Sequence, residues 1–139
     1  PKGSGEHFAL DQGEVMFPPD SPPQIDLMTP KECFKNAADM TVMDFFGEGG
    51  DYDYVEGYVM DSHLPFPIHH AWIAPKGTND VVDPTMGWRP GAVYVGVKME
   101  SGYVRRKLVE NGYYGLFSDG WRPNPLILYE DEDFDYKHR

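Results

Sequence analysis

The sequence has very little cysteine: Cys33 is the only one in 139 residues. A single cysteine excludes an internal disulfide and is consistent with a reducing compartment, so we expect a cytoplasmic protein. The sequence also lacks an apolar run near the ~18 residues that cross a bilayer. No charged-then-apolar signal peptide opens it. We therefore expect no membrane partner.

Basic residues are also scarce. The chain has 12 Lys and Arg against 23 Asp and Glu, a formal net charge of −11. Nucleic-acid-binding proteins present basic faces to phosphates, so we expect no nucleic-acid partner. The acidity disfavours an anionic membrane surface for the same reason. Solubility is the simplest explanation of the charge, with attraction to a basic partner or mimicry of nucleic acid as alternatives.

The length fits a single domain, which we place at residues 29–129. Residues 1–28 are polar and rich in proline, which blocks helix interiors and central strands. We expect an extended arm there, with a short edge strand near 13–17. Residues 130–139 contain a run of Asp and Glu and are expected to form a solvated acidic tail.

The clearest helix is predicted to begin at Thr29. Thr29 is a good N-cap, Pro30 suits the first helical position, and Glu32 completes a capping box. An apolar stripe of helical period follows, and Gly47 is expected to end the helix. Cys33 therefore lies in the first turn, where unpaired backbone N–H groups and the helix dipole favour an anion.

Beyond the first helix the pattern changes to strands. Aromatic and β-branched runs bounded by turn residues predict strands at 52–60, 69–74, 80–83 and 91–98, a short helix at 101–111, and a last strand at 113–117 that closes the sheet. Because strand residues alternate between faces, His70 and Trp72 share one face and His69 lies on the other. We predict an α+β fold in which the cysteine-bearing helix packs on an antiparallel sheet.

Cys33, His70 and Asp83 have the residue types of a thiol nucleophile, a base and an orienting group. The thiolate is the nucleophilic form, and a helix start and a protonated His both favour it. Asp83 follows His70 by thirteen residues across a turn, as expected for neighbouring antiparallel strands. Facing side chains on such strands lie roughly 5 Å apart.

Four segments resemble the transglutaminase-like superfamily of papain-like cysteine enzymes. They are a cysteine opening a helix with small residues one turn on (33–38), a strand ending in Gly-Tyr (54–59), His-Ala-Trp (70–72) and Val-Asp-Pro-Thr (82–85). The resemblance implies a helix carrying Cys on an antiparallel sheet carrying His and Asp. It also implies protein cross-linking, deamidation, peptide hydrolysis or deglycosylation, with no metal and no cofactor.

Three further residues complete the predicted site as substrate contacts: Trp72, Trp88 and Asn36. Trp88 follows the Asp83 segment closely and could wall a substrate cleft. Gln24 and Asn36 are the candidate side-chain donors to an oxyanion, beside the backbone N–H of the nucleophile.

Several alternatives stay open. Cys33 could be an inert core thiol, and His69 could act in place of His70. A zinc site from Cys33, His69, His70 and Asp83 is another alternative, although adjacent strand residues such as the two histidines point to opposite faces. Our first hypothesis is cysteine-dependent acyl transfer or hydrolysis at an amide bond of a protein or peptide substrate. The second is a non-enzymatic binding or inhibitor protein on the same fold, such as a phage or bacterial accessory factor. The oligomeric state is left open.

Overall fold

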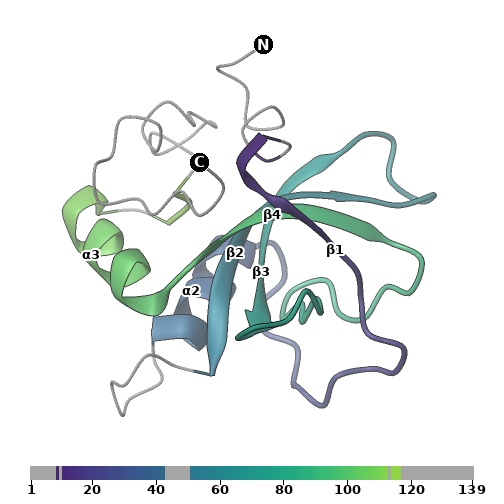
Figure 1. The fold of residues 1–139 in the computed structure, drawn as a ribbon, viewed down its shortest axis with the longest axis horizontal. Helices are drawn as coiled ribbons and strands as arrows, with labels where there is room; N and C mark the ends of the chain where they lie inside the picture. The colour runs from purple at the N-terminus through teal and green to yellow at the C-terminus, as the bar shows by residue number, and fades with distance from the viewer. Residues whose placement is uncertain (1–8, 10, 43–50, 113, 117–139) are drawn as a thin grey trace.

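The computed structural model describes residues 9, 11–42, 51–112 and 114–116. Its elements are β1 (Glu14–Met16), α2 (Cys33–Val42), β2 (Tyr52–Met60), β3 (Ile68–Pro75), β4 (Val93–Met99) and α3 (Ser101–Asn111). The protein is a small α+β structure in which the helices cover one four-stranded antiparallel sheet (Figure 1). The predicted fold class is confirmed at this level.

The strand order in the sheet is β1-β4-β2-β3, and every pairing is antiparallel. β1 is the edge strand expected near 13–17. In the middle of the sheet, Gly57 of β2 lies opposite His70 of β3 and Gly96 of β4. Beyond the other edge, an isolated antiparallel bridge joins Ile73 to Val82. The segment predicted as a strand at 80–83 therefore does lie beside β3, but only through this bridge.

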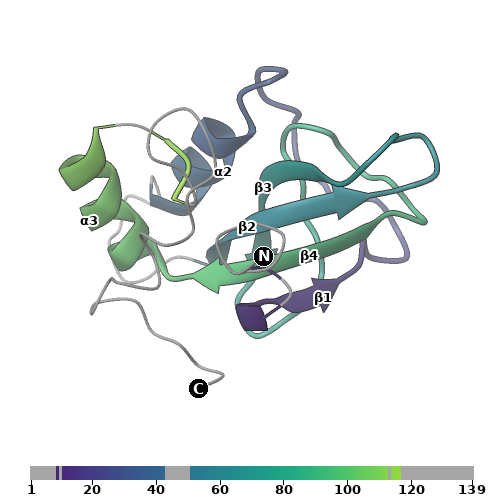
Figure 2. The same ribbon diagram turned by 90° about the horizontal axis from the view of Figure 1, so that it is seen from above.

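The sheet separates two apolar clusters. Both helices lie on one side of it (Figure 2). The cluster on that side includes Ala37, Ala38, Tyr54, Tyr58, Ala71, Ile73, Tyr103 and Val104. The opposite side is covered by connecting segments, and its cluster includes Met16, Val55, Val59, Trp72, Val81, Ala92 and Tyr94. Burial on both faces explains why β2 is apolar at consecutive positions instead of alternating.

Glycine in β4 makes room for a large side chain on the second face. A Cβ atom built on Gly96 would lie 2.6 Å from the Trp72 ring, closer than a carbon contact allows. The indole of Trp72 is fully buried there. Its ring centroid is 6.0 Å from that of His70, with the two planes inclined by 23°. The sheet therefore supports the His70 ring with a rigid aromatic neighbour.

The start of α2 differs from the prediction. The helix begins at Cys33, and the predicted capping box at Thr29 is wrong. Lys31 has φ 67°, a left-handed conformation that no helix can include, so the chain turns at this point. The first intrahelical bond runs from the Asn36 N–H to the Glu32 carbonyl at 2.8 Å. Cys33 remains in the first turn, now as its first helical residue.

At the other end of the described chain, α3 has the predicted bounds and is capped by a glycine. Gly112 has φ 76° and donates its N–H to the Leu108 carbonyl. The strand expected at 113–117 is not formed by its described part, because residues 114–116 are a bend and turn. The predicted helix end at Gly47 and the acidic tail at 130–139 lie outside the described residues. Within those residues, neither α2 nor α3 is long and apolar enough to cross a bilayer.

Candidate active site

His70 and Asp83 come together at the β3 edge of the sheet. The backbones of Ile73 and Val82 exchange two hydrogen bonds of 2.9 Å, which fixes the antiparallel register there. That register sets Asp83 opposite Trp72, on the face that carries His70. His70 Nε2 and Asp83 Oδ2 are 2.7 Å apart. Both residues are buried, so water competes little for this contact.

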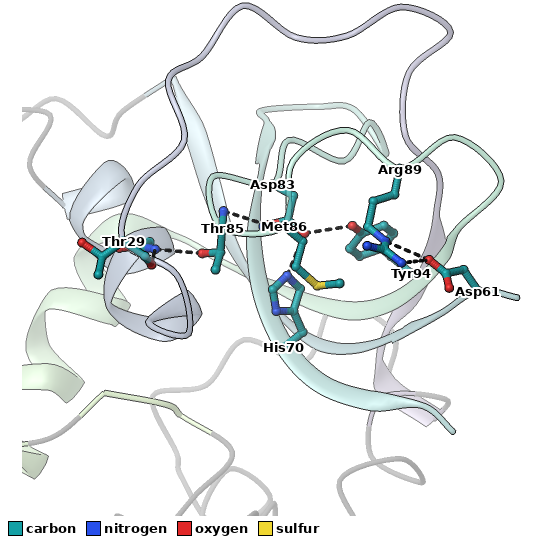
Figure 3. Close-up of polar contacts among 9 residues, drawn as sticks. Thr29, Asp61, His70, Asp83, Thr85, Met86, Arg89 and Tyr94 are labelled. Carbon is teal, nitrogen blue, oxygen red and sulfur yellow. Dashed lines mark hydrogen bonds and ion pairs between the residues drawn. The ribbon is translucent and has the colours of Figure 1, made fainter. Parts of the chain in front are cut away.

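The carboxylate of Asp83 is surrounded by donors (Figure 3). Its Oδ1 accepts the backbone N–H groups of Thr85 at 3.0 Å and Met86 at 2.9 Å. Its Oδ2 accepts the Tyr94 hydroxyl at 2.8 Å and also faces the His70 ring. Burial raises the pKa of Asp83, but the His70 contact and the other donors outweigh it and lower the pKa below its usual value. Asp83 is therefore a fixed anion behind the imidazole.

Tyr94 was not predicted as part of the site. It lies on β4, is fully buried, and shares the second apolar cluster with Trp72. Burial raises the pKa of Tyr94, and the neighbouring charge of Asp83 raises it further, so its hydroxyl stays protonated and donates. The sequence offers only a weak signal, because a tyrosine in a strand is ordinary. The alternation of side chains along β4 does place Tyr94 on the face of the sheet that carries Trp72.

Cys33 opens α2, has no disulfide partner and is partly accessible to solvent. Burial lowers the pKa of His70, but hydrogen bonds and charge interactions with Asp83 and Cys33 raise it, to about 9 overall. The imidazole is thus paired with the Asp83 carboxylate, and the Cys33 thiol is near enough to influence its pKa.

Asn36 holds α2 against the Asp83 loop. Its side-chain amide donates to the Thr29 carbonyl at 2.8 Å and to Thr85 Oγ1 at 2.9 Å. Thr85 is one of the two residues whose backbone N–H groups donate to Asp83. Asn36 is buried, and both of its amide hydrogens are used within the protein. Asn36 therefore ties α2 to the Asp83 loop. It has no amide hydrogen left for the expected roles in substrate contact or oxyanion binding.

His69 lies on the opposite face of β3 and has its own carboxylate. Its Nε2 is 2.8 Å from Oε2 of Glu56, a fully buried residue of β2. The other oxygen of Glu56 accepts the Tyr54 hydroxyl at 2.5 Å. The His69 ring also packs against Phe34 of α2, with centroids 4.8 Å apart. The contact with Asp83 therefore distinguishes His70 from its neighbour.

The alternative of a zinc site needs both histidines on one ion. They face opposite sides of the sheet and bond different carboxylates, Glu56 and Asp83. Across the part of the chain that the structure describes, no three His, Cys, Asp or Glu side chains group as metal ligands.

The two predicted tryptophans differ in position. Trp72 is fully buried and packs beside His70, so it does not contact substrate as expected. Trp88 is 39% exposed and lines a pocket that also reaches Asp83. Its indole N–H donates to the Pro19 carbonyl at 2.8 Å. Trp88 thus has the exposure that a cleft wall needs.

A separate ion pair lies on the side of Asp83 away from Thr29 (Figure 3). Arg89 Nε lies 2.8 Å from Asp61 Oδ2, and a second guanidinium nitrogen contacts the same oxygen (Figure 3). The Arg89 hydrogen bond is the main cause that lowers the pKa of Asp61. The pair joins the loop after β2 to the loop that carries Trp88.

Comparison of the chain with protein families, with curated proteins and with solved structures gave no match.

Proposed function

We propose that the protein is a cysteine-dependent enzyme that transfers or hydrolyses the acyl group of an amide. The observation that carries the proposal is the buried His70 ring, which lies 2.7 Å from the Asp83 carboxylate and whose pKa is raised by Asp83 and by the Cys33 thiol. A buried imidazole that is held by a carboxylate and influenced by a partly accessible thiol is what an activated nucleophile requires. A merely structural cysteine needs neither partner.

In the first step the thiolate of Cys33 attacks the carbonyl carbon of the amide, and a carbon–sulfur bond forms. With its pKa raised to about 9, His70 is an imidazolium at neutral pH. It protonates the departing nitrogen as the carbon–nitrogen bond breaks. Ammonia or an amine leaves, and a thioester on Cys33 remains.

In the second step water or another amine attacks the thioester. The neutral imidazole of His70 takes the proton of the attacking group, the carbon–sulfur bond breaks, and the thiolate returns. Asp83 holds the ring in one orientation and stabilises its charged form in both steps. Water gives hydrolysis or deamidation, and an amine gives cross-linking.

The developing oxyanion needs donors close to the sulfur. The first N–H groups of a helix have no intrahelical partner. Since Cys33 is the first residue of α2 and the first intrahelical bond is made by Asn36, the backbone N–H groups of residues 33–35 are the nearest such donors. They and the helix dipole favour negative charge at this point.

The direct test is the alkylation rate of Cys33 at pH 6. At that pH an ordinary thiol, with a pKa near ~8.5, is almost entirely protonated and slow. We expect iodoacetamide to modify Cys33 at least about tenfold faster than a free thiol, and both His70→Ala and Asp83→Asn to remove most of the advantage. A Cys33→Ser protein reports the background.

Catalysis itself is tested by trapping the thioester. Glutamine-containing polypeptides are incubated with the protein and then with hydroxylamine. Mass spectrometry should find an acyl group on Cys33 and its hydroxamate afterwards. An alkylation rate of Cys33 that is the same in His70→Ala as in the native protein would contradict the proposal. It would favour the second candidate, a binding protein, which the Trp88 pocket supports because that pocket needs no thiol.

A further inference from the structure

A pocket of about 200 Å³ lies between the proline-rich segment of residues 18–27 and the loop that follows Asp83. Its walls include Pro18, Pro23, Ile25, Leu27, Val81 and Trp88. Sites for drug-sized ligands occupy about 300–1,000 Å³. The smaller volume here suits one large side chain. Because the walls are almost entirely apolar, that side chain would be apolar too.

Hydrogen bonds hold the two walls together. Trp88 Nε1 donates to the Pro19 carbonyl at 2.8 Å. The Met28 N–H donates to the Pro84 carbonyl at 2.8 Å, and the Val81 N–H donates to Phe17 at 2.9 Å. The proline-rich segment is thus fastened at its beginning and at its end. The pocket is formed before any ligand arrives.

The pocket is also close to the proposed chemistry. Asp83 is part of its lining and bonds His70. The wall at Leu27 continues directly to Thr29, whose carbonyl is held by Asn36 of α2. The chain therefore runs from the pocket wall to Cys33 in six residues. Six residues span at most about 20 Å, which is within the reach of an extended peptide.

Two large apolar side chains stay open to solvent at the pocket. Leu27 is 63% exposed and Trp88 is 39% exposed. Exposed apolar surface rimmed by polar residues marks interaction sites. The flat face of the Trp88 indole and the rings of three lining prolines suit an aromatic ring better than a branched aliphatic group. These prolines are Pro18, Pro22 and Pro23.

The segment that forms the proline-rich wall of the pocket and continues to α2 is acidic, and we call it the acidic rim. Asp20, Asp26 and Glu32 are all exposed, and Lys31 is the one basic residue in the segment 18–32. The whole chain carries a net charge of −11. Such a field attracts positively charged partners and repels acidic ones.

We propose that this pocket binds an aromatic side chain of a basic polypeptide segment. This inference rests on the proposed function, because the bound segment is then the part of the substrate near its reacting amide. The aromatic ring enters between Trp88 and Leu27, and flanking lysines or arginines face the acidic rim. The pocket thereby selects the substrate, while Cys33 acts on it.

The test is peptide binding to the full chain carrying Cys33→Ala, so that no chemistry occurs. Titration calorimetry compares acetyl-Lys-Phe-Gly-Lys-amide with acetyl-Lys-Ala-Gly-Lys-amide and acetyl-Glu-Phe-Gly-Glu-amide. We expect the Phe peptide to bind at least about tenfold more tightly than the Ala peptide, since a buried aromatic ring contributes that much. The Glu peptide should bind more weakly than its Lys counterpart, with the difference shrinking as salt increases.

Variants of the pocket locate the binding. In Trp88→Ala and in Leu27→Ala the Phe preference should fall to near one. Leu27→Ala is the second variant because Leu27 is 63% exposed and its loss should not unfold the chain. Val109→Ala is the matched control, an 81% exposed apolar residue on α3. It should keep the full preference.

Two results would overturn the inference: equal affinity for the Phe and Ala peptides, or a Phe preference that survives both pocket variants. The outcome is independent of the alkylation test. A reactive Cys33 with no Phe preference leaves the enzyme proposal standing without this pocket. A Phe preference with an unreactive thiol leaves the pocket standing as a binding site.

Discussion

His70 and Tyr94 meet at one atom: the imidazole Nε2 and the phenol oxygen lie 2.7 and 2.8 Å from the same carboxylate oxygen of Asp83. The two rings come from strands that do not pair with each other, β3 and β4. Tyr94 is therefore a positioning residue. It does not reach the thiol, yet it sets how strongly the carboxylate holds the base.

Tyr94→Phe should slow the alkylation of Cys33 on the acid side of its pH profile. The Tyr94 donor is one of the causes that lower the pKa of Asp83, so its removal raises that pKa. A carboxylate with a depressed pKa orients His70 until the pH falls through that value. In the variant this loss should occur at higher pH. The acid limb of the Cys33 alkylation profile should move upward, whereas an unmoved limb would exclude Tyr94 from positioning the base.

The stability of the protein should fall as the pH rises from 7 to 10. The pKa of His70 is about 9 in the folded chain against 6.5 for an ordinary histidine. A raised pKa stabilises the folded state fully below about 6.5, and this contribution is lost as the pH passes 9. The difference corresponds to roughly 3 kcal/mol.

Urea unfolding at pH 6, 8 and 10 measures that dependence, with His70→Gln for comparison. Glutamine keeps a polar group against Asp83 but takes up no proton. The variant should be less stable than the native chain at pH 6 and nearly equal to it at pH 10. Parallel curves for the two proteins would show that His70 does not carry the pH dependence.

Asn36→Ala should destabilise the fold and slow the thiol together. It removes two part-buried hydrogen bonds and leaves the Thr29 carbonyl and the Thr85 hydroxyl without their donor. Such losses cost about 1–3 kcal/mol. The neighbouring Lys35→Ala is the control, since it removes only an exposed pair with Asp39, worth at most about 1 kcal/mol. Denaturation and alkylation rates measured on both variants decide whether Asn36 ties α2 to the Asp83 loop.

The two tryptophans should respond in opposite ways to truncation. Trp72 is fully buried, so Trp72→Ala should cost about 3–5 kcal/mol. Trp88 is 39% exposed and makes one hydrogen bond to Pro19, so Trp88→Ala should cost about 1 kcal/mol. Thermal melts of both variants test this. A large loss in Trp88→Ala would mean that the pocket is part of the core.

Periodicity was enough to predict the regular parts of the fold. β2 and α3 coincide with the segments expected at 52–60 and 101–111, because aromatic and β-branched runs and a C-cap glycine are local signals. The start of α2 was missed because the local capping signal at Thr29 lost to a turn. The left-handed Lys31 in that turn has no signature of its own in the sequence.

The site was predictable only in part, because sequence patterns report local structure and not contacts between distant segments. The order of Cys33, His70 and Asp83 follows from motifs, and strand alternation separates His69 from His70. Whether a side chain is deep or exposed depends on contacts between distant segments. Alternation therefore gave the face of Trp72 but not its depth. Asn36 became a tether only because Thr85, forty-nine residues later, lies beside it.

Because β3 carries two consecutive histidines, its register decides which imidazole faces Asp83. A slip of β3 by one residue would send each imidazole to the other face. His69 would then face Asp83 and His70 would face Glu56. Both contacts, at 2.8 and 2.7 Å, would have to break for this to happen. The Glu56–His69 pair thus helps to hold the register that keeps His70, and not His69, on the face of Asp83.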